Sequence, residues 1–206
     1  MNSIKEYTPF GKQNNMKIEF IIPTYNRPNQ LMTVISSIFS QSSPNWTVHV
    51  VADAMYEGYQ KVKDYFKDDQ RIRFSELSGP HKDWGHTARN YGLQLATEEW
   101  VVMTGDDNYY MPIFVEDFLN AVDENTHFVY CNMIHNWTNQ QYLHINSIPK
   151  VGGIDIGNFM SKTDLSKKIK LDPSKAISDG LFVEEYLTKY NHGVIKKINK
   201  PLYVHN

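Results

Sequence analysis

The stretch WVVMTGDDN, residues 100–108, places two adjacent aspartates directly after a short apolar run. A run of this length, bounded by polar residues, predicts a buried strand. In open α/β sheets ligands bind beyond the carboxyl ends of the strands, which is where Asp106 and Asp107 would lie. The stretch therefore predicts a central strand of the fold and a functional site at the end of that strand.

The chain on both sides of this stretch alternates between strand and helix patterns. Short runs rich in β-branched residues predict further strands at residues 18–22, 47–52 and 71–75. Apolar residues at helical spacing predict helices at residues 29–40, 56–66, 87–96 and 112–122. Such alternation is typical of right-handed βαβ units around a parallel sheet. We therefore expect an α/β fold with a mostly parallel central sheet.

The second half of the chain has a less regular pattern. Strands are predicted at residues 128–132 and 142–148, and a helix is predicted at residues 178–190. Glycines punctuate residues 152–157 and predict a loop there. With 206 residues, the sequence predicts a loose polar arm at residues 1–16 and one domain at residues 17–206.

Composition excludes several classes of protein. Hydrophobic residues make up 41% of the chain, enough for a core, and the formal net charge of −2 gives no general attraction to nucleic acid. The single cysteine, Cys131, allows no intrachain disulfide, which fits a reducing compartment. There is no signal-peptide core and no apolar run of membrane-spanning length. We expect a soluble, cytoplasmic protein with no transmembrane segment.

Polar clusters follow three of the predicted strands. They are the run 24–27 (Thr-Tyr-Asn-Arg), the single residue Asp53, and the run 106–108 (Asp-Asp-Asn). Because the carboxyl ends of parallel strands meet at one edge of the sheet, we expect these side chains to surround one crevice.

The adjacent carboxylates allow two interpretations. Asp106 and Asp107 could form a turn and cap a helix, because Asp and Asn are common at both places. However, two neighbouring anions repel each other, and a turn needs only one of them. Mg²⁺ or Mn²⁺ prefers carboxylate oxygens together with substrate phosphates, so a metal–diphosphate site is the second interpretation. No glycine-rich phosphate loop is present, which argues against ATPase and dehydrogenase functions.

Three motifs carry a resemblance to a known family. FIIPTYNRPNQLMTVISSIFSQS (residues 20–42), then Asp53, then GHTARNYGLQLATEEWVVMTGDDNYYMP (residues 85–112) resemble the family 2-like glycosyltransferases with the GT-A fold. The order and the spacing of these motifs match the family over about residues 17–120. One motif departs from the family's pattern, because the usual Leu-Asp-x-Asp-Asp is Met-Thr-Gly-Asp-Asp at residues 103–107. The first aspartate of the motif is thus replaced by Thr104 or Gly105.

The resemblance implies a nucleotide-sugar-binding half at residues 17–110 and an acceptor-binding half at residues 111–206. It assigns donor binding to seven residues, namely Pro23, Thr24, Tyr25, Arg27, Asp53, Arg89 and Asp106. Tyr25 would offer a face for the base to stack on, with Arg27 near it. Asp53 would accept a hydrogen bond from a ring N–H, which suits uracil, although it could instead cap its strand. The loop at residues 81–86 could cover the donor.

The same resemblance implies a divalent metal, Mn²⁺ or Mg²⁺. We favour Asp107 as the metal ligand, with Asp106 facing the ribose or the sugar. GT-A enzymes often supply a late histidine as a further ligand, and His205 follows a short apolar run that could return it to the crevice. The alternative for His205 is an exposed tail position.

An inverting transfer also needs a general base that accepts the proton of the acceptor hydroxyl. The resemblance places that base at the start of a late helix, where this chain has Asp179. The alternative for Asp179 is a helix N-cap, because both Ser178 and Asp179 suit a helix start. Glu184 is the reserve candidate for the base.

We therefore expect a metal-dependent hexosyltransferase that moves a sugar from a nucleotide-sugar to a hydroxyl of a glycan acceptor. A UDP-sugar is the favoured donor, and a GDP-sugar is possible. Two other functions stay open. One is a non-catalytic nucleotide- or glycan-binding domain of the same fold, which Asp179 pointing away from the crevice would favour. The other is a sugar nucleotidyltransferase, which usually needs a glycine-rich basic loop that residues 23–27 do not form.

Overall fold

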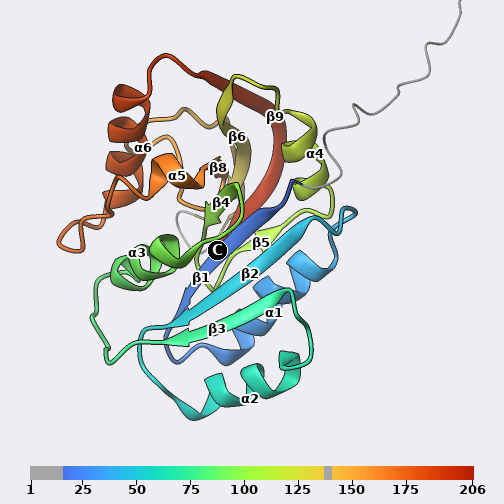
Figure 1. Ribbon diagram of the computed structural model, residues 1–206, viewed down its shortest axis with the longest axis vertical. Coiled ribbons are helices and arrows are strands. Elements are labelled where there is room, and N and C mark those ends of the chain that lie inside the picture. Colours follow the sequence, from blue (N-terminus) through green and yellow to red (C-terminus); the bar gives the residue numbers. More distant parts are fainter. Residues whose placement is uncertain (1–15, 137–140) are drawn as a thin grey trace, which may run out of the picture.

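The computed structural model describes residues 16–136 and 141–206. The predicted arm at residues 1–16 therefore lies almost entirely outside the described residues. Within the described part, the strands join into one nine-stranded sheet with helices on both faces (Figure 1). No helix in that part combines the length and the apolarity needed to cross a bilayer.

Strands and helices alternate through the first half as expected. The elements are β1 (Ile18–Thr24), α1 (Pro28–Phe39), β2 (Trp46–Ala52), α2 (Glu57–Phe66), β3 (Ile72–Glu76), α3 (His86–Leu95) and β4 (Trp100–Met103). The strands lie in the order β3-β2-β1-β4, and each neighbouring pair is parallel. The α/β fold predicted from the sequence is confirmed, and the predicted elements in this half end within two residues of the observed ones.

Strand β1 lies between β2 and β4, and both of its faces carry buried apolar residues. Phe20 and Ile22 pack into one core with α1, whose apolar side chains at helical spacing are buried. Ile21 points to the other face and packs into a second core with Leu93 of α3. Side chains alternate across a strand, so one short run of residues supports helices on both faces of the sheet.

The second half adds a mixed portion to the sheet. Its elements are β5 (Tyr109–Tyr110), α4 (Phe114–Asn120), β6 (Thr126–His135), β7 (Leu143–Ile145), β8 (Phe159–Lys162), α5 (Thr163–Ser166), α6 (Ser178–Lys189) and β9 (Val194–His205). Strand β8 pairs antiparallel with both β4 and β6, and β9 runs parallel to β6. Thus the sheet is parallel throughout its first half only. Sequence patterns did not indicate β5, β8 or α5, and they indicated only the last residues of β9.

Strand β9 lies between β6 and β5 in the sheet and carries the C-terminus back towards the turn after β4. Its twelve residues include register shifts opposite Asn132, where Pro201 interrupts the regular ladder. Its last residues pair antiparallel with β5, the two-residue strand that follows Asp107 almost directly. This pairing places His205 beside the turn that holds the adjacent aspartates.

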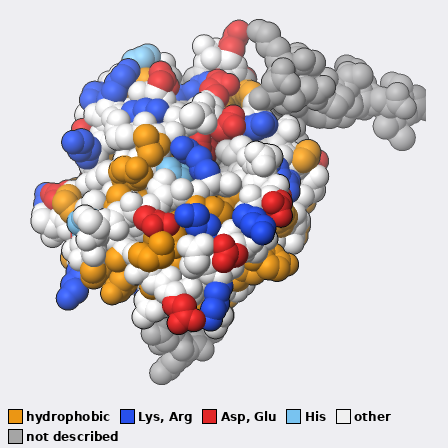
Figure 2. Space-filling model, turned by 60° about the horizontal axis from the view of Figure 1, so that its bottom comes forward, with side chains coloured by type: hydrophobic (Ala, Val, Ile, Leu, Met, Phe, Trp, Pro, Cys, Tyr) orange, Lys and Arg blue, Asp and Glu red, His pale blue; other side chains and the backbone are white. Residues whose placement is uncertain are grey.

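The surface carries charges of both signs. On the face shown in Figure 2, Lys and Arg side chains lie interspersed with Asp and Glu side chains, and apolar side chains lie between them. This distribution agrees with the formal net charge of −2.

Substitution of Gly92 tests the close packing of α3 on the sheet. A Cβ atom at this position would lie 2.6 Å from Ile21 Cγ2 and 3.1 Å from Val51 Cγ2. Gly92→Ala should therefore lower the free energy of unfolding by about 1–3 kcal/mol through overpacking, although alanine is the better helix former. Thermal or urea unfolding measures the change. Tyr91→Ala, at an exposed position of the same helix, is the control, and equal stability of Gly92→Ala and wild type would contradict the prediction.

Candidate active site

A cavity of about 470 Å³ opens beyond the carboxyl ends of β1, β2 and β4. This is the edge of the sheet at which the sequence placed the three polar clusters. Apart from the reserve candidate Glu184, every residue predicted for donor binding, metal binding or catalysis lines the cavity, namely Pro23, Thr24, Tyr25, Arg27, Asp53, Arg89, Asp106, Asp107, Asp179 and His205. The structure thus brings all of them together, and their chemical roles stay predictions.

Asp106 is held by contacts that come from the end of β1. The Thr24 hydroxyl donates a hydrogen bond of 2.8 Å to Asp106 Oδ2, and Arg27 Nη1 lies 3.3 Å from Asp106 Oδ1. The same Nη1 atom lies 2.7 Å from Asp107 Oδ2. Therefore one guanidinium group bridges both carboxylates and reduces their repulsion. Arg27, which was predicted to lie near the base, lies against the aspartates instead.

The two aspartates differ in their surroundings. The carboxyl group of Asp106 is buried, and burial raises its pKa, assisted by the charge of Asp107 and opposed by the bonds from Thr24 and Arg27. The side chain of Asp107 is 32% exposed and faces the cavity. Asp107 is therefore the more accessible of the two carboxylates for a ligand in the cavity.

The interpretation of the aspartates as a local turn and helix cap is only partly right. Asp106 and Asp107 do lie in a turn between β4 and β5. However, the carboxylate of Asp106 bonds to residues about 80 positions away in the chain. The N-cap of the following helix is Ile113, which makes no side-chain capping bond. Neither aspartate caps that helix, so the turn alone does not account for the pair.

Asp53 ends β2 at the opposite side of the cavity. Its Oδ2 atom accepts a hydrogen bond from the His81 backbone N–H at 2.8 Å, and its Oδ1 atom lies 2.5 Å from His81 Nδ1. A carboxylate has about four acceptor positions, so these two contacts leave room for a further donor. Tyr25 lies at the mouth of the cavity with 46% of its surface exposed, which leaves its ring available to a ligand.

Arg89 joins the loop before α3 to the turn after β4. The side chain is buried, and it donates hydrogen bonds to the carbonyl oxygens of Thr104 at 3.0 Å and Trp84 at 2.7 Å. Burial lowers its pKa, while nearby carboxylates, Asp155 first among them, oppose the shift. Arg89 therefore brings positive charge to the centre of an acidic cavity and also fixes two of its walls.

Residues 82–86, from the stretch predicted to cover the donor, line the cavity. Lys82 and Trp84 both have left-handed backbone conformations, with φ values of 56° and 58°. Asp83 holds the loop onto α3, because its carboxylate accepts hydrogen bonds from the Gly85 and Thr87 backbone N–H groups. Non-glycine residues with positive φ persist where their surroundings hold them, and they gather at functional sites.

Asp179 enters the cavity from the first turn of α6. The N-cap of this helix is Ile177, so Asp179 is not the cap. Burial raises the pKa of Asp179 to about 6, and the charge of Asp155 contributes in the same direction. A carboxyl group with this pKa is suited to accept a proton near neutral pH. The reserve candidate Glu184 instead bonds the backbone N–H of Val151 and does not line the cavity.

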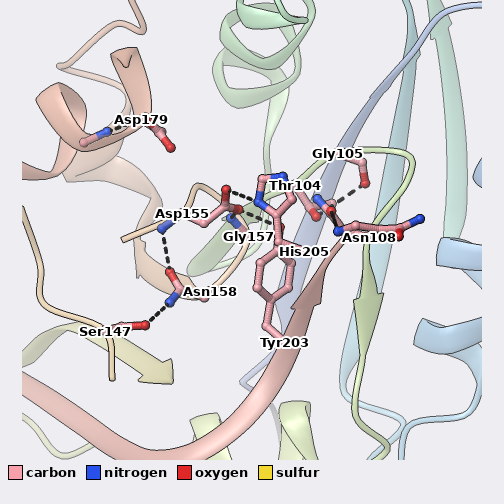
Figure 3. A network of polar contacts seen from close by, with 12 residues as sticks. Thr104, Gly105, Asn108, Ser147, Asp155, Gly157, Asn158, Asp179, Tyr203 and His205 are labelled. Atoms are coloured by element: carbon pink, nitrogen blue, oxygen red, sulfur yellow. Dashed lines mark hydrogen bonds and ion pairs between the residues drawn. The ribbon is translucent and has the colours of Figure 1, made fainter. Parts of the chain in front are cut away.

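Asp155 lines the cavity, although the sequence patterns predicted no role for this residue itself. It accepts hydrogen bonds from the Tyr203 hydroxyl at 2.5 Å and the Gly157 backbone N–H at 3.0 Å, and it lies 2.6 Å from His205 Nδ1 (Figure 3). Burial alone would raise its pKa, but the contacts with His205 and Tyr203 outweigh burial, and the pKa falls to about 2. The only sequence signal was an aspartate within a glycine-containing loop.

The donor atoms around Asp107 fit a hard divalent cation. Asp107 offers carboxylate oxygens and His205 offers an imidazole nitrogen, and both line one cavity. Mn²⁺ and Mg²⁺ prefer carboxylate and phosphate oxygens, and an imidazole nitrogen is a ligand for a transition-metal ion such as Mn²⁺ rather than for Mg²⁺. Within residues 16–136 and 141–206, His, Cys, Asp and Glu side chains form no ready-made group of three that could hold a metal ion. Arg27 lies against the carboxylates, so a cation would have to replace part of its contacts.

Comparison with known proteins identifies the family. The model of glycosyl transferase family 2 matches residues 19–178, well over half of the chain. This chain belongs to glycosyl transferase family 2. The resemblance drawn from the PTYNR, ARN and GDD stretches is thereby confirmed.

The relatives of this family 2 chain are distant in sequence. An uncharacterized glycosyltransferase of Rickettsia conorii is 26% identical over 137 residues, which cover 66% of this chain and 22% of the relative. The matched part of the chain therefore spans about a fifth of the length of that relative.

Two solved structures share the fold. Staphylococcus aureus TarS 1–349, solved with UDP-GlcNAc, superposes with a TM-score of 0.74 at 21% identity, covering 92% of this chain and 58% of TarS 1–349. The mannosyltransferase PcManGT from Pyrobaculum calidifontis, solved with GDP-Man and Mn²⁺, gives a TM-score of 0.68 at 16% identity. The match covers 94% of this chain and 58% of PcManGT. These matches confirm the GT-A fold of the family 2 chain.

Replacing Asp179 should stabilise the protein in a pH-dependent way. The pKa of about 6 in the folded chain exceeds the ordinary value near 4, so ionised Asp179 destabilises the fold above pH 6. Below about pH 4 the carboxyl group is protonated in both states, and the destabilisation disappears. We expect Asp179→Asn to raise the free energy of unfolding by on the order of 1–2 kcal/mol at pH 8, after allowance for its partial exposure, with the gain vanishing as the pH falls from 6 to 4.

Urea unfolding at several pH values measures this gain. Glu185→Gln, on an exposed position of α6, controls for the loss of a charge from the same helix. A gain for Asp179→Asn that is absent at pH 8, or that is equally large at pH 4, would contradict the raised pKa.

Proposed function

We propose that this chain is a metal-dependent, inverting glycosyltransferase that moves a sugar from a nucleotide-sugar, most suitably a UDP-sugar, to a hydroxyl group of a glycan acceptor. The observation that carries the proposal is the position of Asp179. It faces the same cavity as Asp53 and the Asp106–Asp107 pair, and its pKa is suited to a general base. This arrangement supports a catalytic site rather than a domain that only binds nucleotides.

The donor's nucleoside would lie over the carboxyl ends of β1 and β2. Asp53 would accept a hydrogen bond from the ring N–H of uracil, using acceptor capacity that His81 leaves free. The exposed ring of Tyr25 would stack on the base, next to Pro23 and Thr24. The neighbours of known structure support this class of donor, because TarS was solved with UDP-GlcNAc and PcManGT with GDP-Man.

The diphosphate would lie between Asp107 and the basic residues of the cavity. Asp107 and His205 would hold Mn²⁺ or Mg²⁺, which when bound offsets the negative charge of the departing diphosphate. Arg27 would give up part of its contact with Asp107 and remain close enough to face the phosphates. Its side chain is 51% exposed, so the structure leaves it room to move. Asp106 would stay fixed by Thr24 and face the ribose or the sugar.

Asp179 would act on the acceptor. The acceptor oxygen forms a bond to the anomeric carbon as the bond from that carbon to the diphosphate oxygen breaks. Asp179 accepts the hydroxyl proton, and the nucleoside diphosphate leaves with the bonding electron pair. Attack on the face opposite the leaving group inverts the anomeric configuration. Burial of Asp179 keeps its pKa close enough to neutrality for this proton transfer.

Nucleotide binding tests the donor site. Calorimetry with UDP, GDP and CMP, each with Mn²⁺ and with EDTA, should show UDP binding that needs the metal. Asp107→Ala should weaken binding in Mn²⁺ by about 10-fold or more, while Asp68→Ala, which removes an exposed aspartate, should bind as wild type does. A preference for GDP would change the donor, and no binding of any nucleotide by the folded protein would refute the donor site.

The pH dependence of turnover tests the base. Release of UDP from UDP-GlcNAc by water, which takes the place of the acceptor hydroxyl, should fall about tenfold per pH unit below pH 6, because protonated Asp179 cannot accept a proton. Asp179→Asn should lose about 10²- to 10⁴-fold in rate with little change in UDP affinity. Glu184→Gln is the matched control. A large loss for Glu184→Gln with normal turnover of Asp179→Asn would transfer the role to Glu184.

A further inference from the structure

Asp155 makes an unusually complete set of contacts for a residue outside the family motifs of this chain. Its side chain is 10% exposed and accepts from three donors on two different segments. Gly157 N–H and the Tyr203 hydroxyl both bond Oδ1, so the second oxygen, Oδ2, is left for His205 Nδ1. In Figure 3 the carboxylate lies between its own loop and the end of β9.

The loop that carries Asp155 is itself fixed to the core. Asn158 Oδ1 accepts a hydrogen bond from the Asp155 backbone N–H at 3.1 Å. Asn158 Nδ2 donates to the Cys131 carbonyl oxygen at 2.8 Å and to Ser147 Oγ at 2.9 Å, and all of these residues are buried. The carboxylate therefore has a defined position before any ligand enters the cavity.

An ionised carboxylate only accepts hydrogen bonds, so its partners must donate. His205 Nδ1 must therefore carry a hydrogen, and in the neutral ring this leaves the lone pair on Nε2. The His205 ring also stacks on His135 at a centroid distance of 4.1 Å, which restricts its rotation. His205 lines the cavity while its Nδ1 atom is engaged with Asp155.

We propose that Asp155 is a positioning residue that holds His205 in the Nδ1–H tautomer and so presents Nε2 to the cation of the donor site. This inference rests on the proposed function, because it assigns a task within that site. A carboxylate that orients a metal-binding histidine through its other ring nitrogen commonly changes metal affinity about 10- to 100-fold when it is replaced. Tyr203 and Gly157 hold the carboxylate, and Asp155 in turn holds the imidazole.

Asp155→Asn is the informative variant because it keeps the shape of the side chain and reverses the direction of its hydrogen bond with His205. Its carbonyl oxygen can still accept from Tyr203 and Gly157. Its amide group would then face His205 Nδ1 and donate to it, which forces the hydrogen of the neutral ring onto Nε2. Tyr203→Phe is the matched control, since it removes one bond to Oδ1 and leaves the contact between Oδ2 and His205.

Nitrogen NMR of the histidine rings tests the tautomer without metal or nucleotide. The signal of His205 is identified by its loss in His205→Ala, and spectra are recorded at a pH where the ring is neutral. Wild type and Tyr203→Phe should show the Nδ1–H form, and Asp155→Asn should show the Nε2–H form. A wild-type ring in the Nε2–H form, or a tautomer that Asp155→Asn leaves unchanged, would overturn the inference.

Calorimetric binding of Mn²⁺ in the presence of UDP tests the consequence. Asp155→Asn should lose about 10- to 100-fold in Mn²⁺ affinity, and Tyr203→Phe should lose less. In a His205→Ala background, Asp155→Asn should have no further effect. Equal losses with and without His205 would show a merely structural role and overturn the inference. If wild type binds no Mn²⁺ with UDP, the proposed function fails, and the tautomer measurement alone decides the assignment of Asp155.

Discussion

Six aspartates line one cavity, and the rest of the site depends on how their charges are compensated. They are Asp53, Asp83, Asp106, Asp107, Asp155 and Asp179. Neighbouring carboxylates raise one another's pKa unless cations or hydrogen-bond donors lie between them. Arg27, Arg89 and His205 supply charge or donors inside the cavity, and backbone N–H groups at the loop ends supply the rest. The arrangement of these donors decides which carboxylates stay ionised.

As a result, the aspartates of the cavity differ in pKa, because each carboxylate has different surroundings. Asp155 accepts three hydrogen bonds, and its pKa falls to about 2. The carboxylate of Asp179 accepts a hydrogen bond from the Gly180 backbone N–H, but burial outweighs such bonds and raises its pKa to about 6. Separation of carboxyl pKa values by surroundings is the way in which one site obtains both fixed charges and a titrating base. The proposed function therefore assigns the base to Asp179, a carboxylate whose ionised form the fold stabilises poorly.

The sequence predicted the first half of the fold well because its signals are local. Each buried strand is a short apolar run, and the rule that ligands bind at carboxyl strand ends was enough to bring Thr24, Asp53 and Asp106 together. Asp155 could not be found in this way, because its side-chain partners Tyr203 and His205 lie about 50 residues ahead on β9. Nor did the pattern indicate the length of β9, whose polar and charged residues follow no strict alternation. Such nonlocal pairings leave little trace in a single sequence.

A two-residue ladder joins the two parts of the site. Tyr109 pairs with Val204, and Tyr110 pairs with Tyr203, so the turn that holds Asp107 lies one register step from His205. The backbone N–H of Asn206 reaches the side chain of Asn108 at 3.3 Å and extends this contact by one residue. Because β9 also runs along β6, the position of His205 depends on the second half of the sheet, whereas Asp107 depends on the first. The site is therefore complete only when both halves of the sheet have folded together.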